Sequence, residues 1–231
     1  MQTTLLPKRV CMEIEKLIMK FIWGNSFDGR HVHLVDWNTL CKPKADGGTC
    51  FKHLEDQNAA FLMKLTFGLV AQPDRFWVRV LRSKYMCDGV IPNIVMRCNK
   101  SHLWKGICSV WDEVRSHISW KIGNGDDIDF WTDRWVGEIG CLKDWVLPNI
   151  LLLDGSIPLS SMVNEFGELK WDVFQHLLPL PIVMRIAAII PPCASVPCDC
   201  FRWDVSSDKK FLVRSAYRIK IQQSESQADP I

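Results

Sequence analysis

The chain lacks the features that would place it in a membrane or direct it to secretion. No apolar run in its 231 residues reaches the roughly 18 to 20 residues that a helix needs to cross a bilayer. The most apolar stretch, residues 181–190, is short and carries Arg185. The first apolar segment holds four charged side chains within residues 13–20, unlike a cleavable signal peptide. We therefore expect a soluble, intracellular chain with no membrane partner.

Known catalytic sequence motifs are also missing. There is no GxxxxGK[ST] phosphate loop, no GxSxG nucleophile turn and no HExxH zinc pair. The Gly123-Asn124-Gly125 cluster resembles a phosphate-binding loop only loosely, because it lies between two strand-like segments and does not open a helix. We expect a tight turn there. We also expect no enzyme activity, no small-molecule substrate and no cofactor.

One group of carboxylates offers an alternative to this expectation. Asp126, Asp127, Asp129 and Asp133 lie close together in the sequence. Acidic clusters that bind Mg²⁺ are used in nucleotide chemistry, so a Mg²⁺-dependent nuclease is one hypothesis. Two of the four alternate with apolar residues, which favours solvated carboxylates on the outer face of a half-buried strand.

The ten cysteines include no CxxC pair, the strongest sequence signal of a structural zinc site. Without a secretory signal a disulfide set is disfavoured, because reducing compartments keep thiols free. His31, His33, Cys41 and Cys50 have a spacing compatible with tetrahedral metal coordination, but it matches no common zinc finger or ribbon. The alternative is that the thiols act as small apolar side chains. We expect this alternative, and therefore no metal.

The composition is that of an ordinary globular protein, with 48% hydrophobic and 23% charged residues. The net charge of +2 is unevenly distributed. Residues 1–125 hold 18 Lys or Arg against 11 Asp or Glu, and residues 126–231 hold 10 against 15. A basic first half is compatible with a surface for phosphate backbones, or with ordinary solvated charges beside an acidic second half.

Apolar residues recur with helical spacing in the first half of the chain. One stripe, within 9–22, ends at Gly24, and another, within 54–69, ends at Gln72-Pro73. Two further helices are predicted after the N-caps Asp74 and Ser101. Their buried faces are expected to hold Trp77, Val80 and Leu81 in the first, and Trp104, Ile107, Cys108, Trp111 and Val114 in the second. Such stripes could stack on bases, but helical spacing favours a core.

The periodicity changes near Trp120, where apolar residues alternate around the glycine turn and predict a β-hairpin over 120–130. A second hairpin is predicted from 200–204 and 210–213. Short helices are expected near 171–178 and 181–190, and a last one over 215–221 before a polar tail. The expected fold class is mainly α with small antiparallel β hairpins (α+β), as a fragment of a larger protein.

Five sequence blocks stand in a characteristic order. They are LLPKRVCMEIEKLIMKFIWG (5–24), HLVDWNTLCKPKADGG (33–48), FWVRVLRSKY (76–85), WKIGNGDDIDFWTDRWVG (120–137) and SAYRIK (215–220). Together they resemble plant non-LTR (LINE-type) retrotransposon polyproteins, whose members carry reverse-transcriptase or ribonuclease H names. The similar region is the connector between the reverse-transcriptase thumb and the zinc-binding and ribonuclease H parts. One departure is visible: the family usually has Gly-Leu-Gly where this chain has Gly48-Thr49-Cys50.

This resemblance implies a non-catalytic fragment. The family's polymerase aspartates would precede the segment, and its zinc ligands and ribonuclease H carboxylates would follow it. Residues 1–118 would form a helical thumb- or connector-like region, and residues 119–231 a hairpin-containing region that ends at the start of a zinc-binding-like module. The alternative is a structural remnant of a decayed retroelement with no independent activity. A nuclear location is expected if the chain follows its parent element.

The resemblance also implies contact with template RNA or target DNA. The candidate contacts are Lys8, Arg9, Lys42, Lys44, Arg79, Arg82, Lys84 and Arg97. Contact of this kind would be independent of sequence and would weaken with salt, because counterion release drives it. Each residue could instead be an ordinary solvated charge.

The aromatic content predicts a further property. Eleven Trp and eleven Phe are a large apolar load for a fragment whose helix faces once packed on neighbouring parts. The helix within 9–22 is the strongest candidate for an uncovered face. We therefore expect self-association through exposed apolar faces.

Overall fold

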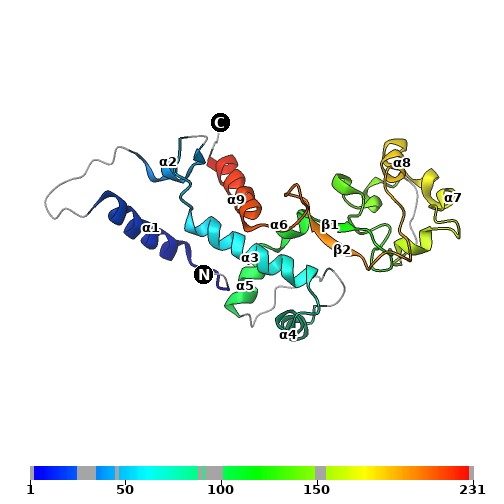
Figure 1. Ribbon diagram of the computed structural model, residues 1–231, viewed down its shortest axis with the longest axis horizontal. Coiled ribbons are helices and arrows are strands. Elements are labelled where there is room, and N and C mark those ends of the chain that lie inside the picture. The colour runs from blue at the N-terminus through cyan, green and yellow to red at the C-terminus, as the bar shows by residue number, and fades with distance from the viewer. Residues whose placement is uncertain are drawn as a thin grey trace. The chain divides into compact units, whose positions relative to one another are not determined.

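The computed structural model describes residues 3–24, 35–44, 47–87, 91, 101–148 and 155–228 (Figure 1). The chain forms two compact units, each assembled from segments far apart in the sequence. The first unit contains 1–69, 94–114 and 212–231, and the second contains 70–93 and 115–211. The predicted fold class is confirmed, because the described residues are mainly helical with one small antiparallel sheet.

Helices make up the first unit. They are α1 (Lys8–Trp23), α2 (Trp37–Cys41), most of α3 (Leu54–Ala71), α5 (His102–Ser109), the start of α6 (Trp111–Ser116) and α9 (Val213–Ala228). The stripes predicted within 9–22 and 54–69 are confirmed as α1 and α3. None of the helices among the described residues is both long and apolar enough to span a bilayer.

The core of the first unit lies where α5 meets α3. Ser101 caps α5 as predicted, its Oγ accepting a hydrogen bond from the Trp104 N–H at 3.2 Å. Trp104 and Ile107 are fully buried, so their stripe is core. A Cβ at Gly106 would lie 2.7 Å from a methyl carbon of Leu62, so a larger residue here would force the Leu62 side chain to shift.

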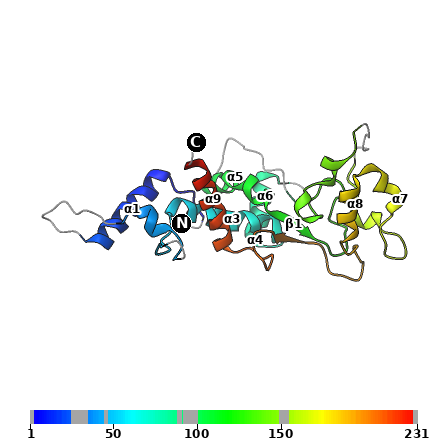
Figure 2. The same cartoon turned by 90° about the horizontal axis from the view of Figure 1, so that it is seen from above.

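Helix α9 joins the same core. The Tyr217 hydroxyl accepts a hydrogen bond from the His53 N–H at 3.1 Å, just before α3 begins. Lys220 forms an ion pair with the mostly buried Glu113. Figure 2 shows α9 and α3 from above. The helix was predicted to end near Ile221, but its backbone continues to Ala228.

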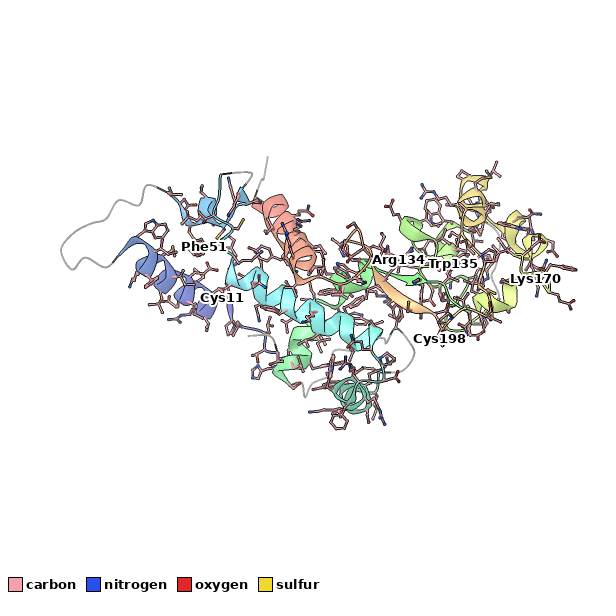
Figure 3. The ribbon with its side chains drawn as sticks, viewed as in Figure 1. Cys11, Phe51, Arg134, Trp135, Lys170 and Cys198 are labelled. Atoms are coloured by element: carbon pink, nitrogen blue, oxygen red, sulfur yellow. The ribbon has the colours of Figure 1, made fainter. Side chains whose placement is uncertain are left out.

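Helix α1 buries little of its apolar stripe. Cys11 is its buried residue, labelled in Figure 3. Leu17 is 64% exposed and Phe21 is 88% exposed. The apolar pattern correctly predicted a helix, but the residues that form the stripe largely face away from the core.

The second unit consists of short elements. They are α4 (Phe76–Tyr85), β1 (Ile118–Lys121), η2 (Gly137–Ile139), η3 (Leu142–Trp145), η4 (Leu159–Met162), α7 (Trp171–Phe174), η5 (Gln175–Leu177), α8 (Leu180–Ala187) and β2 (Cys200–Trp203). The N-cap predicted at Asp74 is wrong, since the cap position of α4 is Arg75 and has no side-chain bond. Val78 and Tyr85 are the buried residues of α4, whereas Val80 is 47% exposed.

The two predicted hairpins do not form. Strand β1 instead pairs antiparallel with β2, with Ile118 opposite Trp203 and Lys121 opposite Cys200. The segment around Ile128 turns away from β1 and bonds to residues 157–159. Alternation predicted extended segments correctly, but it carries no information about which segment lies alongside.

Aromatic side chains dominate the core of the second unit. The Phe130 ring lies 4.9 Å from Trp131, 5.5 Å from Trp135 and 4.8 Å from Phe174, measured between ring centroids. Trp135, labelled in Figure 3, donates its indole N–H to the Phe130 carbonyl at 2.9 Å. These aromatic contacts hold together the loops and short helices between β1 and β2, whose described residues form no long helix or strand.

Candidate nucleic-acid interface

Helix α4 carries the densest set of predicted contacts. Arg79, Arg82 and Lys84 lie on its ten residues, Arg75 occupies its N-cap, and the helix contains no carboxylate. Arg79 and Lys84 are exposed. The Lys84 Nζ lies 5.5 Å from the centroid of the Tyr85 ring. The arrangement presents several cations along two to three helical turns, a geometry suited to successive phosphates.

The remaining predicted contacts lie in the first unit. Lys8 and Arg9 begin α1, and Lys8 pairs with Glu55 at 3.5 Å, which partly neutralises it. Lys42 and Lys44 are exposed in the loop after α2. The eighth predicted contact, Arg97, lies outside the described residues.

Backbone hydrogen bonds hold the loop of Lys42 and Lys44 in place. The Gly48 N–H donates to the Pro43 carbonyl at 3.0 Å, and the Cys50 N–H donates to the Lys42 carbonyl at 3.1 Å. A Cβ at Gly48 would lie 2.0 Å from the Lys42 carbonyl oxygen, so glycine is required here. These bonds fix the backbone on both sides of the two lysines, at Lys42 and Pro43 and at Gly48 and Cys50.

Three cations of the first unit were not among the predicted contacts. Lys52, Arg214 and Arg218 line one cavity of about 460 Å³ with Phe51 and Tyr217. Residues four apart share a helix face, but Arg214 lies one residue before the helix predicted over 215–221, so the sequence did not pair it with Arg218. Nothing in the sequence placed Lys52 beside them, because more than 160 residues separate these positions.

The carboxylates near residue 129 are only partly solvated. Asp126 and Asp127 are exposed as predicted, but Asp129 is 9% exposed. Its carboxylate accepts hydrogen bonds from the N–H groups of Trp131, Thr132 and Ile157 at 2.7 to 3.0 Å. Burial opposes ionisation, but these bonds and one from Ser156 outweigh it and hold the pKa of Asp129 below its ordinary value. The prediction of a solvated Asp129 is therefore wrong.

Asp133 lies beside Asp129 in a different environment. Its carboxylate accepts a hydrogen bond from the Asp129 N–H at 2.8 Å. Burial raises the pKa of Asp133, and the neighbouring Asp129 charge adds to the rise. Asp133 thus accepts from a backbone group of its own loop, whereas Asp129 accepts both from its own loop and from the segment at Ile157.

The glycine cluster is a tight turn, as predicted, and it surrounds a carboxylate of the same chain. Asp199 accepts hydrogen bonds from the N–H groups of Gly123 at 2.6 Å, Gly125 at 3.1 Å and Asp127 at 3.2 Å. Backbone amides that converge in this way bind anions. Here the bound anion is an internal side chain, so the turn fastens the end of β1 to the segment before β2.

The candidate metal ligands do not form a cluster among the described residues. Within 3–24, 35–44, 47–87, 91, 101–148 and 155–228, no three His, Cys, Asp or Glu side chains gather in a metal-binding arrangement. Cys41 is buried and Cys50 is exposed, while His31 and His33 lie outside the described residues. Burial raises the pKa of Cys41 to about 11, with Glu15 and Asp36 adding to the rise. That thiol is therefore protonated at neutral pH.

Comparison with known proteins places the chain in a family. No protein-family model and no solved structure matches it. A protein of Arabidopsis thaliana, "Uncharacterized mitochondrial protein AtMg00310", is 30% identical over 132 residues, which are 57% of this chain and 86% of that protein. The chain belongs to this retroelement-related family.

A second relative from Arabidopsis thaliana matches nearly the whole chain. The "Putative ribonuclease H protein At1g65750" is 28% identical over 230 residues, which are 95% of this chain. The chain spans 36% of the length of that relative. The expectation that this chain is not an enzyme is contradicted by the comparison, because a relative aligned over 95% of it bears the name of an enzyme.

Proposed function

We propose that the chain holds the phosphate backbone of RNA or DNA, without sequence preference, as part of a ribonuclease H-type retroelement protein. The observation that carries this proposal is α4, whose exposed cations have no carboxylate within the helix. Phe76 on the same helix is 80% exposed. Cations interleaved with exposed aromatic side chains suit a nucleic acid, which offers both phosphates and bases.

We further propose that the chain corresponds to the connector of a LINE-type element. The alignment over most of the chain with a longer protein bearing a ribonuclease H name supports this placement. A connector would present the nucleic acid to neighbouring catalytic parts. On this proposal, residues 1–118 are the thumb- or connector-like region and residues 119–231 lead toward a zinc-binding-like module.

A charge-matched pair of variants tests the role of α4. Arg79→Gln with Lys84→Gln removes two exposed cations from the helix. Lys143→Gln with Lys210→Gln removes two exposed cations elsewhere in the same unit. We expect the α4 variant to lower affinity for a labelled duplex about tenfold at low salt and to flatten the salt dependence, because two phosphate contacts are lost. Equal losses in the two variants would mean that net charge alone drives binding.

The name of the longer relative supports a second candidate, cleavage of RNA in an RNA–DNA hybrid. The exposed carboxylates of Asp126 and Asp127 border a cavity of about 250 Å³ in the second unit. Incubation of the chain with a labelled hybrid and Mg²⁺ tests this candidate directly. Cleavage that survives in the double variant Asp126→Asn, Asp127→Asn would exclude these carboxylates as its source.

We also propose that the chain associates with itself through α1. Leu17 and Phe21 are 64% and 88% exposed, and such apolar residues on one helix mark an interaction surface. The variant Leu17→Gln, Phe21→Gln should be more monomeric than the wild type in sedimentation velocity at micromolar concentration. A monomeric wild type would refute the proposal.

A further inference from the structure

The cavity of the first unit has an unusual chemical lining. About 460 Å³ in volume, it lies between the loop that joins α2 to α3 and the first turns of α9. Its lining includes Phe51, Lys52, Arg214, Tyr217 and Arg218. No carboxylate occurs among the described residues that line it. A cavity of this size is in the range of small-ligand sites.

Three cations line this cavity, and none of them has an anionic partner among the described residues. The Lys52 Nζ lies 3.8 Å from the centroid of the Tyr217 ring. Arg214 and Arg218 lie four residues apart on α9 and are exposed. Burial lowers the pKa of Lys52, and the charges of Arg214 and Arg218 lower it further. An anion bound here would relieve this mutual repulsion.

One carboxylate of this unit, Glu15 on α1, is engaged in hydrogen bonds within the fold. Glu15 accepts hydrogen bonds from the Leu54 N–H at 2.6 Å and from the Trp37 indole at 3.1 Å. Within the part of the chain that the structure describes, no ion pair involves Lys52, Arg214 or Arg218. Their positive charge is therefore available to a partner.

An aromatic ring stands at the edge of the same cavity. Phe51, labelled in Figure 3, is 39% exposed, and its ring centroid lies 5.6 Å from that of Trp37. Because Glu15 holds the Trp37 indole, the Phe51 ring has a fixed support on one side. The exposed part of the Phe51 side chain could contact a planar group.

We propose that this cavity binds one nucleotide of a single-stranded nucleic acid. Arg214, Arg218 and Lys52 take the phosphate, and Phe51 stacks on the base. Charge complementarity selects the phosphate, and the exposed ring requires a base whose face is free, as in a single strand but not within a duplex. This inference rests on the proposed function and adds to it a defined site and a preferred strand state.

The test compares two probes and three variants of the full chain. The probes are a fluorescein-labelled ten-nucleotide oligouridylate and a labelled RNA duplex of equal length, measured by anisotropy at two salt concentrations. The cavity variant is Arg214→Gln with Arg218→Gln, and the stacking variant is Phe51→Leu. The matched control is Lys64→Gln with Lys105→Gln, which removes two exposed cations of the same unit that do not line the cavity. Unchanged circular dichroism verifies that each variant is folded.

We expect the cavity variant to weaken oligouridylate binding about tenfold and to reduce the salt slope by about 0.7, the value for one lost single-strand phosphate contact. Phe51→Leu should weaken oligouridylate binding about fivefold or more and leave duplex binding unchanged. The control should change either affinity by no more than about twofold.

Different failures have different meanings. If the wild-type chain binds neither probe at low salt, the proposed function is wrong. If it binds both probes but the cavity variant behaves like the control, the proposed function stands and this inference is wrong. Equal weakening of both probes in the stacking variant would refute the single-strand preference.

Discussion

The two units of the chain use their charged side chains in opposite ways. In the second unit, Asp129 and Asp199 each accept three backbone N–H groups, so their charge stabilises loops. In the first unit, Lys52, Arg214 and Arg218 line a cavity with no carboxylate among its described residues. The net charge of +2 conceals this difference. For function, the important distinction is between charged side chains that are bonded within the fold and those that remain available to a partner.

The comparison predicts that carboxylates of the second unit contribute strongly to stability. Asp129→Asn should lower the free energy of unfolding by about 2 to 3 kcal/mol, because the amide nitrogen cannot accept the bonds that the carboxylate oxygen accepted. Urea unfolding followed by tryptophan fluorescence measures the loss. The control Asp127→Asn changes an exposed carboxylate two residues away and should cost less than about 0.5 kcal/mol. Similar costs for the two would show that the buried bonds of Asp129 add nothing.

Glu15, a carboxylate of the first unit, also accepts hydrogen bonds within the fold. It therefore allows a further test of the comparison between the two units. Glu15→Gln should lower the free energy of unfolding by about 1 to 2 kcal/mol, since only one of its oxygens remains to accept from the Leu54 N–H and the Trp37 indole. Glu13→Gln is the matched control, because Glu13 is exposed and pairs only at the surface with Lys16. A Glu15→Gln variant as stable as the wild type would mean that the internal hydrogen bonds of this carboxylate do not stabilise the first unit.

Acid should remove the contribution of Asp129 selectively. Its pKa is depressed in the folded state, so its ionised form adds stability above the unfolded value of about 4, and this is lost as the pH falls through the folded value. The difference in unfolding free energy between wild type and Asp129→Asn should therefore be constant near pH 6 and shrink below pH 4. A constant difference down to pH 3 would contradict a depressed pKa.

The smallest expected effect concerns the loop beside the cavity. Cys50 has a φ of 62°, in the left-handed region that glycine adopts without steric cost. Cys50→Gly should raise the free energy of unfolding by about 0.5 kcal/mol, the relief of strain being partly offset by the greater freedom of glycine in the unfolded chain. Thr49→Gly, next to it, should instead be destabilising, because the Thr49 hydroxyl donates to the Leu40 carbonyl at 2.9 Å. Thermal unfolding measures both effects: the melting temperature should rise for Cys50→Gly and fall for Thr49→Gly.

Local patterns predicted the helices well. The stripes of α1 and α3, the Ser101 cap and the buried Trp104 face all depend on residues within a few positions of one another. Local patterns failed to predict strand pairing and side-chain partners, because these depend on residues far apart in the sequence. Strand β1 pairs with β2 some 80 residues away, and Asp129 bonds to Ile157, a segment that the alternation of residues 127–130 could not reveal.

The sequence by itself determined the mainly helical class, the positions of most helices and the retroelement-related family, because these depend on short-range periodicity and on the order of sequence blocks. The tertiary structure decided which charges are internal. Lys52 and Arg214 meet only because α9 returns to the start of α3, and Asp199 meets the glycine turn only because β2 pairs with β1. Electrostatic interactions act across space, so their partners are set by the fold and not by distance along the chain.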